Sequence, residues 1–189
     1  MANQDSPFGL RAIGKIGQNR DNQGLAEFSI AASATAIYGQ DPVKALNTGT
    51  IGVAGAGDSL LGALNGVFFT DATTSKPTFA NHLNASNTAT DIVGFVSSDP
   101  YERFEIQSDN TTASAQTDVF MNYDITYAAG SSHDYLSGVE LDDSTTSTAS
   151  GQLRVVGVSK DIKNNDLTAS HVNFVVMINE HFLKGTAGV

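Results

Sequence analysis

Short runs in which apolar and polar residues alternate recur along the chain, and this period of two predicts β-strands. In the clearest run, residues 101–107, Phe104 and Ile106 share one face of an extended chain. Polar residues occupy the other face: Arg103, Glu105 and Gln107. Similar or shorter apolar runs predict strands at residues 28–30, 36–38, 43–46, 51–53, 92–96, 153–158 and 172–179. Turn-forming residues separate these strands, which is typical of a barrel or sandwich.

The glycine-rich stretch at residues 52–66, GVAGAGDSLLGALNG, fits a turn followed by a strand. Residues 55–58 suit a tight turn, because glycine tolerates positive φ and aspartate can bond its own backbone. Behind the turn we expect a strand over residues 60–69, in which Gly62 and Gly66 permit a bulge or a close backbone approach. A helix also fits the apolar spacing, but two interior glycines would cost it about 1 kcal/mol each.

Helix is the minor component of the prediction. Residues 76–87 hold at most one short helix, which Pro77 and the scattered polar residues disfavour. The low-complexity segment at residues 142–150, DDSTTSTAS, is predicted to be an exposed loop without chemistry, and residues 160–166 form a polar loop between two strands.

Residues 1–25 are predicted to form an extended arm, because Pro7, several glycines and irregularly spaced apolar residues do not suit a helix. Such an arm buries little against itself, so it lies on the domain, reaches a neighbouring subunit or stays disordered. Its four apolar anchors are Phe8, Leu10, Ile13 and Ile16. The whole chain therefore predicts a mainly β protein with little helix: this arm, then a single barrel or sandwich-like domain of short antiparallel strands over residues 26–189.

Composition narrows the classes of function. The 189 residues include 10 Lys and Arg against 20 Asp and Glu, a net charge of −10, which disfavours both nucleic-acid binding and anionic membranes. Cysteine is absent, so disulfides and thiolate nucleophiles are excluded. The N-terminus lacks the pattern of a secretory signal, and the most apolar run, residues 174–178, is too short to span a bilayer. We therefore expect a soluble protein made in the cytoplasm.

A hydrolase motif is present only in part. Residues 57–60 spell the GDSL tetrapeptide of a lipase-like family in which a serine, here Ser59, is the nucleophile. That chemistry needs a histidine base, which the family places in a D-x-x-H motif. The residues at that spacing before the four histidines are Phe79, Gly130, Thr168 and Ile178. The same stretch lacks the lysine of a phosphate loop, and Leu60 interrupts a dinucleotide fingerprint. We predict no enzyme, no catalytic residue and no cofactor.

Metal-binding patterns are also incomplete. Residues 19–24 resemble the start of an EF-hand loop, but its twelfth position is Ile30, where a bidentate glutamate is required. The histidines have no pair at metal-ligand spacing: His82, His133, His171 and His181. We therefore predict no metal site, while adventitious Ca²⁺ at residues 142–143 or 164–166 stays open.

A collinear series of short segments runs nearly from one end of the chain to the other. They are ANQDSPFGLR (2–11), FSIA (28–31), DPVK (41–44), GD (57–58) with LG (61–62), DP (99–100) with FEIQ (104–107), LRVVG (153–157), and VMINEH (176–181) with GTAGV (185–189). In this order they resemble a family of small virion proteins of tailed bacteriophages, described as structural, cement or head-decoration proteins. Residues 18–23 depart from the family pattern, in which a more aromatic Asn-Gly-Ser-Pro type of segment is expected.

The resemblance implies a β-rich domain that binds the exterior of the assembled capsid, often as a trimer. We therefore expect a non-enzymatic capsid decoration protein on the virion exterior, made in the host cytoplasm, whose partners are the major capsid protein and further copies of itself. Its arm, through the four apolar anchors, would contact neighbouring subunits, and removing residues 1–16 would weaken capsid binding while the domain stays folded. The net charge suits this role, because it keeps free copies soluble and apart.

Two alternatives stay open. A tail or neck ring component would share the β fold. A host-surface or glycan-binding module would use exposed tyrosines to stack on sugars, although tyrosines also fill cores and interfaces. The candidate tyrosines are Tyr101, Tyr123, Tyr127 and Tyr135.

Overall fold

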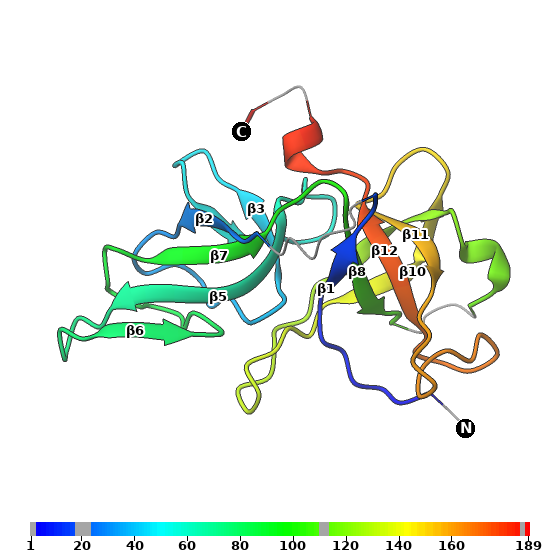
Figure 1. The fold of residues 1–189 in the computed structure, drawn as a ribbon, viewed down its shortest axis with the longest axis horizontal. Coiled ribbons are helices and arrows are strands. Elements are labelled where there is room, and N and C mark those ends of the chain that lie inside the picture. Colours follow the sequence, from blue (N-terminus) through cyan, green and yellow to red (C-terminus); the bar gives the residue numbers. More distant parts are fainter. Residues whose placement is uncertain (1–2, 18–23, 110–113, 186–187) are drawn as a thin grey trace.

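The protein consists of two antiparallel β-sheets that lie side by side (Figure 1). The computed structural model describes residues 3–17, 24–109, 114–185 and 188–189. In spatial order, sheet A contains β1 (Arg11–Lys15), β8 (Glu102–Gln107), β12 (Asn173–Ile178), β11 (Leu153–Val158), β9 (Asn122–Thr126) and β10 (Glu140–Ser147). Sheet B contains β2 (Ala26–Ser29), β7 (Val93–Ser97), β5 (Gly62–Thr70), β3 (Pro42–Ala45) and β4 (Ile51–Val53), with β6 (Pro77–Ala80) also paired to β5.

The mainly β, sandwich-like fold class is confirmed, and the helical content is small. Within the described residues the helices are two short 3-10 turns, η1 (Gln116–Asp118) and η2 (Phe182–Lys184). The structure is not a closed barrel, because β1 and β10 remain the two ends of sheet A. Sheet A curls until a single bridge between Ser108 and Leu141 joins the end of β8 to β10. No helix in the described part of the chain is long and apolar enough to cross a membrane.

Each sheet has a hydrophobic core of its own. The core of sheet A includes Phe104, Tyr123 and Phe174, each at most 2% exposed. The core of sheet B includes Ile37 and Leu64. The chain joins the two cores near the start of β5, because Leu60 and Ala63 pack into the core of sheet A while Leu61 and Leu64 pack into that of sheet B.

The glycine-rich stretch forms the predicted turn. Gly57 has φ +77°. The Asp58 carboxylate accepts a hydrogen bond from the Gly55 backbone N–H at 2.8 Å and pairs with the Lys44 ammonium at 2.8 Å. The hydrogen bond and the ion pair lower the pKa of Asp58, although burial opposes them. The conformational freedom of Gly57 and the hydrogen bond to Asp58 therefore explain why the chain turns at residues 55–58.

Strand β5 follows the turn, as predicted. A Cβ atom on Gly62 would lie 2.2 Å from the backbone oxygen of Ser97 in β7. The register between β5 and β7 shifts between Leu64 and Gly66, which marks a bulge. The expected close approach and bulge are therefore both present, and the helical alternative for this segment is excluded.

Three local predictions are wrong. The strand predicted at residues 36–38 is reduced to an isolated bridge between Ile37 and Leu83. The other two segments, predicted as a helix and a loop, are strands. Residues 76–87 contain β6 instead of a helix, and Phe79 in β6 pairs with Phe68 in β5. Residues 142–150 were expected to be a loop, but most of them belong to β10, which pairs with β9. The Thr145 hydroxyl there accepts a hydrogen bond from the Asp124 backbone N–H at 2.8 Å. Pairing with a neighbouring strand makes both segments extended. Threonine, as a β-branched residue, fits such a strand.

The alternation in residues 101–107 correctly predicts β8, but its polar face is not exposed. Glu105 is 6% exposed and Gln107 is 1% exposed. The Arg11 guanidinium pairs with the Glu105 carboxylate, and the Ser159 hydroxyl donates to the same carboxylate. The N-terminal segment and the loop after β11 therefore cover a face that the pattern assigns to solvent.

The described part of the N-terminal arm lies on its own domain. It contributes β1, an edge strand of sheet A that pairs with β8. Leu10 is fully buried in the core of sheet A. The sequence left open whether the arm lies on its own domain, reaches a neighbouring subunit or stays disordered. For residues 3–17 the structure shows that it lies on its own domain.

Candidate functional site

Residues 3–6 are anchored by two buried amide side chains. The Gln107 Oε1 atom accepts from the Ser6 backbone N–H at 2.8 Å, and Gln107 Nε2 donates to the Gln4 carbonyl oxygen at 2.9 Å. Asn164 Nδ2 donates to the same carbonyl at 2.7 Å. Gln107 is 1% exposed and Asn164 is 5% exposed, so the anchoring groups are themselves fixed by packing. This anchoring determines where Asp5 lies.

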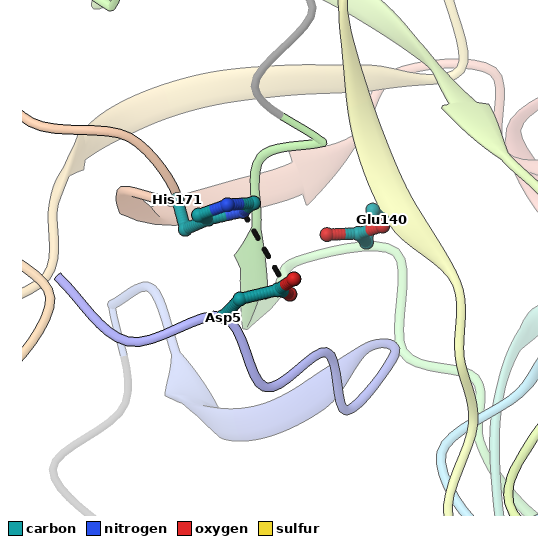
Figure 2. Close-up of side chains that lie close together, drawn as sticks. All are labelled: Asp5, Glu140 and His171. Atoms are coloured by element: carbon teal, nitrogen blue, oxygen red, sulfur yellow. Dashed lines mark ion pairs between the residues drawn. The ribbon is translucent and has the colours of Figure 1, made fainter.

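Three side chains of metal-ligating type converge beside this segment (Figure 2). They are Asp5 from the N-terminal segment, Glu140 at the start of β10, and His171 from the loop before β12. One ligand atom from each lies within 4.8 Å of the other two, and His171 Nδ1 is 3.8 Å from Asp5 Oδ1. Strands that are distant in sequence bring the three segments together.

The electrostatic surroundings of Glu140 are unfavourable to its charge. Burial, followed by the negative charges of Asp5, Asp109 and Asp143, raises the pKa of its carboxyl to about 7. The Glu140 Oε1 and His171 Nδ1 atoms are both shielded from solvent and have no hydrogen-bond partner in the described part of the protein. Among the ion pairs of the described residues, one involves the cluster, and it joins two of its members, His171 and Asp5.

Sequence spacing could not reveal this cluster, because each of its three residues lies on a different segment. The prediction of no metal site rested on that spacing and did not include Asp5 or Glu140. The other proposed cation positions have local hydrogen bonds: Ser144 donates to the Asp142 carboxylate, and Thr168 donates to that of Asp166. Residues 19–23 of the EF-hand-like segment lie outside the described residues.

Ser59 is exposed on the turn before β5, and its hydroxyl donates to the Glu180 carbonyl oxygen at 3.3 Å. The neighbouring histidine, His181, accepts from the Leu183 backbone N–H through Nδ1 at 3.1 Å. No hydrogen bond between Ser59 and a histidine occurs in the described residues. The absence of enzymatic activity stays a prediction.

His181 provides a pH-dependent contribution to stability. It is 2% exposed, and burial, followed by the charge of Lys184, lowers its pKa from 6.5 to about 4. Because the unfolded chain takes up the proton first, this contribution is fully present above pH 6.5 and is lost as the pH falls toward 4. We expect His181 to account for a loss of about 2 to 3 kcal/mol between pH 7.5 and 4.5.

Chemical denaturation at these two pH values checks this expectation. The variant His181→Gln should lose less stability on acidification than the unmodified protein. The control His133→Gln alters an exposed histidine and should leave the pH dependence unchanged. An unchanged pH dependence in His181→Gln would contradict the role of His181.

The four predicted contact residues lie in different surroundings. Leu10 is buried in the protein's own core, while Ile13 is 42% and Ile16 is 50% exposed. Phe8 is half-buried, with the Arg11 guanidinium carbon 4.5 Å from its ring centroid. Of the four side chains, those of Ile13 and Ile16 are therefore the most available to a partner.

Ile16 is part of an exposed apolar patch, the Ile16 patch, which we define as Ile16, Tyr101 and Leu183. The Ile16 backbone N–H donates to the Tyr101 carbonyl oxygen at 3.2 Å. The Lys184 ammonium lies 4.9 Å from the Tyr101 ring centroid, and Leu183 precedes it in η2. Tyr101 is 61% exposed and Leu183 is 54% exposed, and the contact of Lys184 with Tyr101 brings η2 to the turn before β8.

The candidate sugar-stacking tyrosines do not form one platform. Tyr123 is 2% exposed and belongs to the core of sheet A. Tyr135 already stacks on His82, with ring centroids 3.8 Å apart. Tyr101 and Tyr127 remain partly exposed.

Comparison with known proteins found no matching family model, no similar curated protein and no similar solved structure.

Proposed function

We propose that this protein is a non-enzymatic structural protein of a tailed-bacteriophage virion, which binds the outer surface of the assembled capsid and stabilises it. The resemblance of its segments to decoration proteins supports this role. The observation that carries it in the structure is the Ile16 patch, where apolar side chains from both ends of the chain face solvent. Exposed apolar surface of this kind is typical of sites that bind other proteins.

The stabilisation would be thermodynamic. A protein that binds only the intact shell stabilises it by RT ln(1 + [L]/Kd), about 2.7 kcal/mol per site when its concentration is one hundred times Kd. Multiple contacts reinforce one another if the protein binds as a trimer to the major capsid protein. Modest apolar contacts at each site are therefore sufficient for this role.

The structure changes the experiment that tests the arm. Removing residues 1–16 would also remove β1 and Leu10, and so uncover part of the core of sheet A. Deletion of a fully buried leucine side chain alone costs about 2 to 5 kcal/mol. Loss of capsid binding by that truncation would not separate a lost contact from a lost fold, so single exposed residues are better targets.

We expect Ile16→Asp to reduce binding to capsids that lack the protein by about tenfold or more, because a charge in an apolar contact is left without water or a partner. Cosedimentation of the purified protein with such capsids measures the affinity. The control Ile162→Asp changes a residue that is 78% exposed in the loop after β11, and its affinity should be unchanged. In Figure 1, η2 lies near the top of the view and this loop lies at the lower right.

Three other results would count against parts of the proposal. Full occupancy by Ile16→Asp would exclude the Ile16 patch as the contact. Failure of the unmodified protein to bind any capsid would exclude the decoration role. Density confined to a single ring at the tail or neck, in a reconstruction of the particle, would instead support the ring component.

A further inference from the structure

The cluster of Asp5, Glu140 and His171 has the composition of a metal site. A histidine nitrogen with two carboxylate oxygens is a donor set typical of Zn²⁺, whereas Ca²⁺ and Mg²⁺ prefer oxygen ligands alone. The charges also fit, since two carboxylates face one imidazole and no lysine or arginine of the described residues forms an ion pair with either of them. The cluster therefore favours a divalent cation over an anion.

The distances are close to those that zinc requires. Zinc bonds of about 2.0 to 2.2 Å in tetrahedral geometry place neighbouring ligand atoms about 3.3 to 3.6 Å apart. The three ligand atoms lie within 4.8 Å of one another, and the pair from Asp5 and His171 is separated by 3.8 Å. The Asp5 side chain is 66% exposed, so it has room for the remaining movement.

Two atoms in the cluster lack the partners that buried polar atoms normally have. Both Glu140 Oε1 and His171 Nδ1 are inaccessible to water and accept or donate no hydrogen bond within the described residues. Leaving a buried polar atom unsatisfied is costly, so such atoms in a folded protein call for an explanation. A bound cation would satisfy both atoms at once.

The supporting side chains hold two of the ligands in position. The carbonyl oxygen of His171 accepts from Asn164 Nδ2 at 2.7 Å and from Gln107 Nε2 at 3.5 Å. The same two amides fix Gln4 and Ser6, the neighbours of Asp5. Fixed backbones on both sides are what a preorganised site needs, because supporting interactions orient ligands.

We propose that Asp5, Glu140 and His171 bind Zn²⁺, with water completing the coordination, and that this ion fastens the N-terminal segment to sheet A. The inference does not depend on the proposed capsid role. Its structural consequence is a link between Asp5, Glu140 in β10 and the loop that carries His171. The segment that leads into β1 would thereby be ordered more strongly.

Calorimetric titration of the metal-free full chain with ZnCl₂ tests the site. We expect one equivalent to bind and binding to weaken at least tenfold in Glu140→Gln and in His171→Asn. Glu140→Gln keeps the shape of this half-buried side chain and removes only its charge, so it should remain folded. Asparagine suits position 171 because His171 has φ +56°, a conformation that asparagine tolerates better than most residues.

A matched control and a second measurement separate this site from adventitious binding. The variant His133→Asn alters an exposed histidine elsewhere and should bind Zn²⁺ as the unmodified protein does. Hydrogen exchange should show that Zn²⁺ slows exchange at the backbone amide of Ser6 in the unmodified protein but not in Asp5→Asn. Full affinity in His171→Asn, absence of binding at millimolar Zn²⁺, or tighter binding of Ca²⁺ than of Zn²⁺ would each overturn the proposal.

Discussion

Replacing Gly62 with alanine is expected to destabilise the protein by about 3 kcal/mol or more, because the new methyl group has no space. A Cβ atom there would lie 2.2 Å from the Ser97 backbone oxygen and 2.8 Å from the Ser97 carbonyl carbon. Both atoms belong to β7, which pairs with β5 along most of its length, so neither can move away without separating the two strands. Chemical denaturation of the purified variant measures the loss.

Gly157 is the matched control for this substitution. It also lies in a strand, β11, at a bulge, but a Cβ atom there would meet no other atom within 4 Å. Gly157→Ala should change the free energy of unfolding by less than about 0.5 kcal/mol. If Gly62→Ala lost less than about 1 kcal/mol, the close approach of β5 and β7 would be wrong.

Replacing Gln152 with leucine is expected to cost about 3 kcal/mol or more. The side chain is fully buried, and its Nε2 donates to the carbonyl oxygens of Gly55 at 2.9 Å and Asp58 at 2.8 Å. Its Oε1 accepts from the Ile125 backbone N–H at 3.1 Å. Leucine has a similar size but leaves all three backbone groups without this partner, and each unsatisfied buried group costs about 1 to 3 kcal/mol.

The effect of Gln152→Leu should appear as lower resistance to denaturant with the same all-β circular dichroism signal. Gln116, an exposed residue of η1, provides the same substitution without buried hydrogen bonds. Gln116→Leu should therefore be close to neutral. Equal stability of the two variants would show that the turn at residues 55–58 does not depend on Gln152.

Strand predictions succeeded where the local pattern was sufficient. The alternation in residues 101–107 and the apolar runs at 153–158 and 172–179 each became a strand of sheet A. The turn and bulge of the glycine-rich stretch also followed from local causes, because positive φ and close approach both require the absence of a side chain. These features needed no knowledge of distant residues.

Predictions failed where a distant segment decided the outcome. Polar, threonine-rich residues 142–147 form a strand because β9 provides a pairing partner. The polar face of β8 is buried because the N-terminal segment and Ser159 satisfy its groups. Local alternation reports which face is polar, but it does not report what covers that face.

The candidate sites depend on tertiary structure even more strongly. From sequence alone, the four apolar anchors of the arm were equivalent, yet packing buries Leu10 and leaves Ile13 and Ile16 exposed. Asp5, Glu140 and His171 have no spacing that marks them as a group, and they meet through strand pairing and the hydrogen bonds of Gln107 and Asn164.

The sequence by itself determined the mainly β character, most strand positions, the acidic charge and the absence of cysteine chemistry. These properties depend on residue type and short-range periodicity, which act within a few residues. Tertiary structure alone decided the pairing of the twelve strands in the described residues into two sheets, the burial of polar groups in β8, and the convergence of Asp5, Glu140 and His171. The physical reason is that these depend on contacts between segments far apart in the chain, where hydrogen-bonding and packing partners are chosen by the fold as a whole.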